Sequence, residues 1–261
     1  MLPTNFLRPL QGLGDVLLYE FAGTSNYNAL LGSYAHRFSH GFNLNLSYTF
    51  SKVLDESDSY GSQVDAFLSS RSRNYGPAGF DRRHTFSASY YYTLPKLTQS
   101  IQFRPAHWIM DRWTISGVTR MSTGGMFTPT YQLINGLPAP SGSTSETARV
   151  SVINPTAPLN QRFAPPPQGP PVSLGNLGRN TIPGPGVNNW DLSLYKDLRF
   201  TERITGQFRI ETYNTFNHTQ FSAVDQTLRF DAAGKQANPL FDLPTSARPA
   251  RRMALGIRLR F

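Results

Sequence analysis

The feature that most constrains the fold is a strict alternation of apolar and polar residues over 42–50, FNLNLSYTF. Phe42, Leu44, Leu46, Tyr48 and Phe50 occupy every second position, and small uncharged polar residues fill the positions between them. Successive side chains of a strand point to opposite faces, so this period of two predicts a strand with one apolar face. The other face suits a wet or hydrogen-bonded lumen.

The last residues of the chain repeat the pattern. One face carries Met253, Leu255, Ile257, Leu259 and Phe261, and the other carries Ala254, Gly256, Arg258 and Arg260. A soluble sandwich can alternate in the same way, with its apolar face in a core. However, the chain ends on an aromatic residue preceded by alternating arginines, and a soluble domain gains little from ending on an exposed phenylalanine.

Five further segments alternate similarly, at 27–38, 86–94, 113–121, 190–196 and 204–210, and a weaker one lies near 15–21. The total is about eight strands, each near the ~10 residues of a tilted membrane strand. No apolar stretch approaches the ~20 residues that a transmembrane helix needs. The sequence therefore predicts an all-β chain of antiparallel transmembrane β-barrel strands.

The links between the expected strands differ in length. Those at 39–41 and 201–203 are short, and those after Phe50, Met121 and Phe216 are long, as in barrels with short periplasmic turns and long outer loops. With a periplasmic C-terminus, the long links fall outside, but the link at 96–111 is longer than a periplasmic turn should be.

The longest link, about 124–186, contains APPPQGPP and NTIPGPG. This density of proline and glycine predicts an extended, unpaired outer loop without another strand pair. A disordered linker between two domains is the competing interpretation. We favour the loop because the same strand pattern resumes at Trp190.

Composition narrows the chemistry. The chain has no cysteine, which excludes disulfides, cysteine metal sites and a cysteine nucleophile. The net charge of +9 fits either a nucleic-acid partner or arginines scattered over loops and lumen. Because no Lys/Arg-rich run appears, we expect the second and no nucleic-acid partner.

No catalytic or cofactor motif is recognisable. The five histidines have no partner at metal-ligand spacing, and no nucleophile elbow, P-loop or dinucleotide fingerprint occurs. The run Asp81-Arg82-Arg83-His84 would point to alternate sides of a strand, so we interpret it as a loop-to-strand junction held by salt bridges at the barrel rim. Arg209 and Glu211 share a polar face, which predicts an ion pair in the lumen. We expect no enzyme activity and no cofactor.

Five segments, in order along the chain, carry a further pattern: SNYNALLGSYAHRFSHGFNLNLSYTFSKVLD, GFDRRHTFSASYYYTLP, DRWTISGVTRMSTGGMFT, NNWDLSLYKDLRFTERITGQFRIETYNTFNHTQF and RRMALGIRLRF. Together these segments resemble the TonB-dependent transporters of the Oar-like type. Each match alone is weak, but the set is specific.

The resemblance implies an outer-membrane barrel of about 22 strands, of which residues 1–261 would be the C-terminal part. It also implies a plug, a periplasmic domain and a contact with the TonB energy-coupling complex, all N-terminal and not visible here. The start of the chain does not resemble a signal peptide. The expected role is therefore the barrel wall of an outer-membrane transporter or receptor that imports an unknown ligand when part of the intact protein.

The chain ending also resembles the signal read by the outer-membrane assembly machinery. Ala254, Gly256, Leu259 and Phe261 fill its positions, although Ala254 stands where a polar residue is usual. A terminal strand of this kind pairs with an open sheet edge, and its alternate side chains give specificity. The expected partners are outer-membrane lipid and this machinery.

Three other functions stay open at this point. The chain could form a self-contained eight-stranded barrel that acts as an adhesin or structural anchor, since eight strands can close around their own side chains. An outer-membrane enzyme is disfavoured by the lack of a recognisable site. A soluble basic nucleic-acid binder would extract without detergent.

Overall fold

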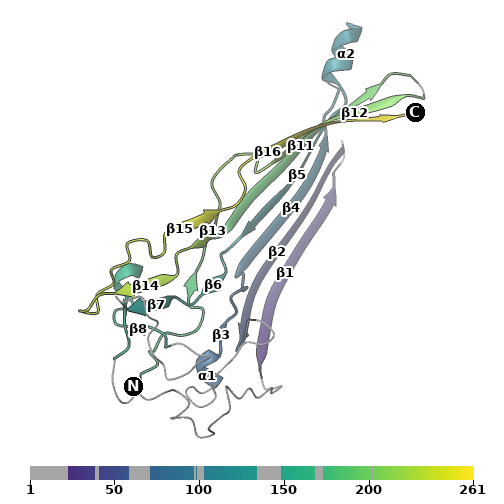
Figure 1. Ribbon diagram of the computed structural model, residues 1–261. Coiled ribbons are helices and arrows are strands. Elements are labelled where there is room, and N and C mark those ends of the chain that lie inside the picture. Colours follow the sequence, from purple (N-terminus) through teal and green to yellow (C-terminus); the bar gives the residue numbers. More distant parts are fainter. Residues whose placement is uncertain are drawn as a thin grey trace, which may run out of the picture.

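The computed structural model describes residues 23–38, 41–58, 71–96, 98, 103–133, 148–167, 173–201 and 203–261. Its main body is one long antiparallel sheet in the order β1-β2-β4-β5-β11-β12-β16 (Figure 1). These strands are β1 (Ser25–Arg37), β2 (Phe42–Asp55), β4 (His84–Thr93), β5 (Trp113–Ser122), β11 (Val187–Arg199), β12 (Thr205–Tyr213) and β16 (Arg252–Arg260). The short β3 (Gly76–Pro77) adds to β2 and completes eight strands. The all-β antiparallel prediction is confirmed, while the strand expected near 15–21 lies outside the described residues.

The strand register keeps the two predicted faces separate across the whole sheet. On the apolar face, Leu46 lies opposite Tyr34 on β1 and Ala88 on β4. On the polar face, Ser47 lies opposite Ser33 and Ser87 in the same way. A register slip of one residue would exchange the faces, so this pairing depends on the alternation seen in the sequence.

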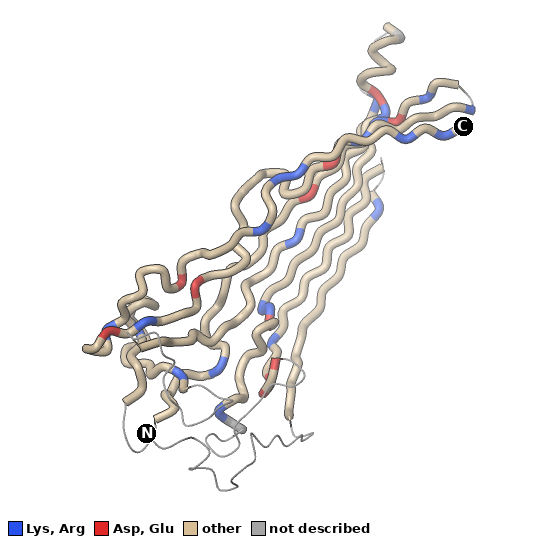
Figure 2. The backbone as a smooth tube through the Cα atoms, in the orientation of Figure 1, with Lys and Arg blue, Asp and Glu red and all other residues tan. Residues whose placement is uncertain are grey.

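The apolar face is not covered by any layer in the described part of the chain. Leu30 on β1 is 69% exposed, and Leu255 and Ile257 on β16 are 70% and 73% exposed. Charged residues gather toward the two ends of the sheet and leave long uncharged stretches along β1, β2 and β4 (Figure 2). An apolar surface of this extent indicates contact with another apolar phase.

The long and short connections separate to opposite ends of the sheet, as the link lengths predicted. The β1–β2 and β11–β12 turns lie at the end that holds the C-terminus, and the three long links lie at the other end (Figure 1). The 96–111 link, which is too long for a simple turn, contains the short helix α2 (Arg104–Met110) at the turn end. No helix in the described ranges is long and apolar enough to cross a membrane.

The two longest links pack into a small lobe at the loop end. The link between β5 and β11 holds β6 (Met126–Phe127), β7 (Thr130–Leu133), β8 (Ser151–Val152), η3 (Leu159–Gln161), β9 (Phe163–Ala164) and β10 (Ile182–Pro183). The link between β12 and β16 holds β13 (Phe221–Val224), β14 (Thr227–Phe230) and β15 (Pro244–Ala247). β7 and β14 pair in parallel and join the two links.

The prediction that 124–186 is unpaired was therefore wrong. β6 pairs with β10, and β8 pairs with β9. The glycines that suggested loose chain instead allow backbones to approach closely: a Cβ on Gly124 would lie 1.7 Å from the Gly184 carbonyl oxygen. Gly175 has a φ of 73°, which favours glycine.

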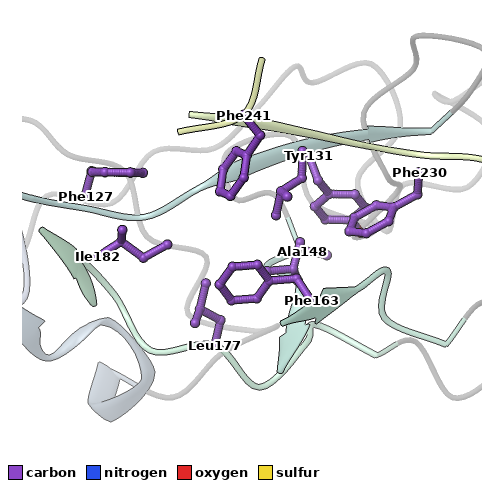
Figure 3. Close-up of a cluster of buried hydrophobic side chains, with 10 residues drawn as sticks. Phe127, Tyr131, Ala148, Phe163, Leu177, Ile182, Phe230 and Phe241 are labelled. Carbon is purple, nitrogen blue, oxygen red and sulfur yellow. The ribbon is translucent and has the colours of Figure 1, made fainter. Parts of the chain in front are cut away.

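A hydrophobic cluster holds the lobe together (Figure 3). Its members come from both links: Phe127, Tyr131, Ala148, Val150, Phe163, Leu177, Ile182, Leu228, Phe230 and Phe241. Leu228 and Val150 are fully buried, and the Tyr131 ring meets the Phe230 ring edge-on at 5.9 Å between centroids. Residues nearly 100 positions apart thus share one core, which the alternation pattern of the strands could not indicate.

Candidate functional site

An arginine from the lobe joins the lobe to the end of the sheet. The Arg179 guanidinium lies 2.5 Å from the Asp55 carboxylate at the end of β2 and 2.7 Å from the Asp58 carboxylate beyond it. It also donates to the backbone carbonyls of Asp55, at 2.7 Å, and Asn74, at 3.3 Å. The planar guanidinium is suited to such multiple bonding. Arg179 and Asp55 are both about nine-tenths buried, so the pair is shielded from solvent.

Asp58 has further partners in this junction. Its carboxylate accepts hydrogen bonds from the Gly79 amide at 2.5 Å and from the Asn180 side-chain amide at 3.0 Å. Burial raises the pKa of the Asp58 carboxyl, but these hydrogen bonds and the Arg179 charge outweigh burial and hold the pKa below its ordinary value of 3.8. The carboxylate is therefore charged at neutral pH and fixes the lobe electrostatically.

Sequence reasoning missed this junction. Arg179 and Asp55 are 124 positions apart. Asp55 ends one of the segments that resemble Oar-like transporters, but the resemblance gives it no partner, and Arg179 lies in none of these segments. Only the fold brings the two residues together, at the loop end of the sheet.

The run Asp81-Arg82-Arg83-His84 lies where β4 begins, as predicted for a loop-to-strand junction. Its contacts are mainly hydrogen bonds to backbone. The buried Asp81 carboxylate accepts from the Val53 amide at 3.0 Å, and the Ser51 hydroxyl donates to the Arg82 carbonyl at 3.2 Å. The His84 ring lies 2.7 Å from the Tyr48 hydroxyl. The run thus fastens β4 to β2 through hydrogen bonds, and the salt bridges expected for it do not form with any residue that the structure describes.

A shallow hollow of about 440 Å³ lies beside this junction. Its lining comes from β1, β2 and the start of β4: Tyr27, Thr49, Ser51, Val53, Phe80, Arg82 and Thr85. The strand residues among them belong to the polar face. The hollow therefore combines a cation with hydroxyl groups on the side of the sheet that faces the lumen of a closed barrel.

The segment NTFNH after β12 is a second junction at the loop end. Asn214 and Asn217 both have left-handed backbone, with φ of 50° and 51°, a conformation that asparagine tolerates. The Asn214 amide donates to the Asp191 carboxylate at 2.9 Å, and the Arg251 amide donates to the Asn217 side chain at 3.0 Å. This turn connects β11, β12 and the approach to β16.

The predicted lumen residues Arg209 and Glu211 lie on the polar face of β12. Arg209 donates to the Gln207 side chain at 2.6 Å and lies over the Tyr195 ring, 5.5 Å from its centroid. Glu211 accepts a hydrogen bond from the Tyr213 hydroxyl at 3.3 Å. The structure thus gives each a different neighbour, and an ion pair between the two stays a prediction.

The four residues of the expected assembly signal lie at the C-terminal edge strand. Ala254 and Gly256 are on the polar face opposite Glu211 and Arg209, whereas Leu259 lies on the apolar face opposite Gly206. Phe261 is fully exposed. In the described part of the sheet, β16 pairs on one side alone, with β12. An exposed apolar end on an open edge is compatible with recognition by strand addition, and that role stays a prediction.

Comparison with known proteins gives one family match. The family model described as an outer membrane beta barrel domain matches residues 1–253. No curated protein and no solved structure matches the chain significantly.

Proposed function

Because the chain belongs to the outer membrane beta barrel domain family, we propose that it forms part of the wall of a TonB-dependent transporter or receptor of the Oar-like type. Membership of the family explains the exposed apolar face, which contacts the lipid of the outer membrane. In this proposal the wall belongs to an intact protein that imports a ligand, and it performs no catalytic step.

The observation that carries the proposal is where the family-like segments fall. The five segments that resemble Oar-like transporters coincide with β1–β2, β4, β5, β11–β12 and β16, which are neighbours in one sheet. Resemblances scattered by chance would not fall on consecutive strands of one sheet in chain order. Each long link between them reaches the loop end, where the lobe and its junctions could contact a ligand.

Strand direction argues against closure of the described sheet on itself. Seven strands form its main path in the described residues, so β1 and β16 run in the same direction. If these strands closed directly on themselves, they would need a parallel seam, whereas single-chain bacterial barrels have even numbers of antiparallel strands. An odd number of further strands between β16 and β1 removes this conflict. The strand expected near 15–21 would supply one, and in this proposal the rest of the protein supplies the others. The proposal thus assigns further strands, a plug and the contact with the TonB complex to the rest of the protein.

A photo-crosslinking experiment tests the proposal in producing cells. A photoreactive amino acid replaces Arg258, which lies on β16 outside the expected assembly signal, and mass spectrometry identifies the peptide captured at its free edge. We expect a peptide from outside residues 1–261. Capture of a peptide from within residues 1–37 would overturn the proposal and favour the self-contained barrel that acts as an adhesin or anchor. The same probe at Ser47 is the control, since it should capture the β1 or β4 peptide.

A further inference from the structure

The helix α2 projects from the turn end of the sheet (Figure 1), and residues in and next to it contact residues of the lipid-facing side. The Trp113 indole, on the apolar face, donates to the Ile109 carbonyl at 2.9 Å. The Trp108 ring meets the Phe200 ring edge-on, with centroids 5.6 Å apart. Phe200 itself lies close to Gly206, whose neighbour across the sheet is Leu259 on the apolar face. The helix is therefore continuous with the surface that contacts lipid.

A lysine on this face is shielded by the end of the helix. Lys196 is opposite Phe208 and Trp113, and a free ammonium there would be costly in lipid. Its Nζ instead donates to the Asp111 carbonyl just after α2 and lies 5.3 Å from the centre of the Trp113 ring. Lys196 is only 5% exposed. The helix end and the tryptophan thus allow a cation at the membrane boundary.

A cavity of about 710 Å³ opens between α2 and the end of β11. Four cations line it: Lys96, Arg112, Lys196 and Arg199. No carboxylate in the described part of the chain forms an ion pair with Lys96, Arg112 or Arg199. The cavity therefore offers cationic groups that can receive an anion.

The two carboxylates of the lining have hydrogen-bond partners other than the Lys and Arg side chains of the cavity. Asp111 accepts a hydrogen bond from the Thr98 hydroxyl at 2.6 Å and lies 3.2 Å from the His107 ring. Asp197 accepts from the Gln207 side-chain amide at 2.9 Å. Arg112 has a φ of 62°, and its carbonyl accepts the Asp197 amide at 3.2 Å, which ties the start of β5 to β11.

Several exposed residues in and next to the helix are apolar. Phe103, Ile109 and Met110, which do not line the cavity, are 67%, 66% and 40% exposed, and Trp108, which does, is half-exposed. Tryptophan, phenylalanine and aliphatic residues beside cations are typical of segments that lie in the membrane interface. A free anion from solution would need the cations but would gain nothing from these apolar groups.

We propose that this cavity binds the head group of an anionic phospholipid in the leaflet at the turn end, while α2 lies in that leaflet beside the acyl chains. The cations neutralise the phosphate, as in basic pockets that hold lipid head groups at membrane boundaries. The apolar residues of α2 then extend the lipid-facing surface beyond the strand ends. The site would fix the turn end of the wall at a defined depth in the membrane.

Tryptophan quenching tests this site directly. The chain has three tryptophans, so Trp190→Phe leaves Trp108, which lines the cavity, and Trp113, which contacts Lys196 of the lining. The protein is extracted from outer membranes and placed in vesicles of phosphatidylcholine and phosphatidylglycerol, with one of the two lipids brominated. We expect brominated phosphatidylglycerol to quench more strongly than its bulk fraction explains. Equal quenching by the two lipids, or none, would overturn the proposal.

Charge variants identify the groups responsible. Lys96→Gln, Arg112→Gln and Arg199→Gln together should weaken the preference for phosphatidylglycerol by on the order of a hundredfold, since each cation near an anionic surface contributes about 1 kcal/mol. The matched control replaces Arg229, Lys235 and Arg248, three exposed cations of the lobe, with glutamine and should keep the preference.

If the triple variant does not reach the membrane, Lys96→Gln is tested by itself, because Lys96 is exposed and follows the end of β4. Loss of the preference in millimolar inorganic phosphate would indicate a site for the free anion and would overturn the lipid assignment.

Discussion

At the scale of single residues, the face on which a side chain lies decides how much stability a substitution removes. Leu46 and Ser47 are neighbours in β2, yet Leu46 lies in a row with Tyr34 and Ala88, and Ser47 in a row with two other serines. Lipid cannot solvate a charge, whereas a wet lumen can. The same change at these adjacent positions therefore separates the two environments.

We expect Leu46→Arg to destabilise the folded protein in lipid vesicles by about 2–4 kcal/mol. Ser47→Arg, its matched control, should cost much less because its side chain faces the polar side. Urea titration of each variant in vesicles measures the difference. Similar losses for the two variants would refute the assignment of the faces.

The Asp58 carboxyl makes the lobe junction sensitive to acid. Its pKa is held below 3.8 in the folded protein, so its contribution to stability is fully present above about pH 3.8 and is lost as the pH falls through the lower folded value. Limited proteolysis of the lobe at a series of pH values should therefore show stable protection down to about pH 4 and increasing cleavage below it. Asp58→Asn should weaken protection at neutral pH and reduce this acid step. An unchanged acid step in Asp58→Asn would assign the step to other groups.

At the scale of elements, we expect a substitution at the end of the terminal strand to affect assembly in the outer membrane more than the stability of the folded protein. Phe261 is fully exposed, so Phe261→Ala should cost far less than the ~3–5 kcal/mol of a buried phenylalanine. As the anchor of an edge-strand signal, its loss should strongly reduce the amount inserted in living cells. Folding into detergent and assembly in cells are compared for Phe261→Ala and for Phe216→Ala, an exposed phenylalanine at the opposite end. Intact cellular assembly, or equal damage in both assays, would leave Phe261 an ordinary interface residue.

The lobe is an element with a core of its own, although the sheet does not depend on it for strand pairing. Leu228 is fully buried there, so Leu228→Ala should destabilise the lobe by about 2–5 kcal/mol. Protease added to intact cells should cut the lobe faster, while the amount of membrane-inserted protein stays the same. Leu240→Ala, at a site that is 59% exposed, is the control. A parallel loss of insertion would mean that the lobe supports the sheet.

At the scale of the whole molecule, the open edges of the sheet determine how the purified chain associates. β1 and β16 carry unpaired backbone groups on their outer sides in the described part of the sheet, and such edges favour pairing with other chains. We therefore expect the 261-residue chain, purified alone in detergent, to form oligomers or aggregates. Size-exclusion chromatography with light scattering measures this. A monodisperse, heat-resistant monomer would instead support a self-contained barrel.

The sequence by itself determined the wall of this protein. A strand exposes alternate residues to alternate faces, so the patterns at 42–50 and 253–261 already specify strands and their two faces. The lengths of the links then determined which ends of the strands lie together. These predictions succeeded because each depends on residues close in the chain.

Only the tertiary structure decided what the long links do. The contact of Arg179 with Asp55, the parallel pairing of β7 with β14 and the placement of α2 over Lys196 all join residues far apart in sequence. Neither periodicity nor composition encodes such pairs, and the same prolines and glycines fit a loose loop or a packed lobe. The difference lies in whether distant apolar and charged groups meet, which depends on the sheet that holds the ends of the links.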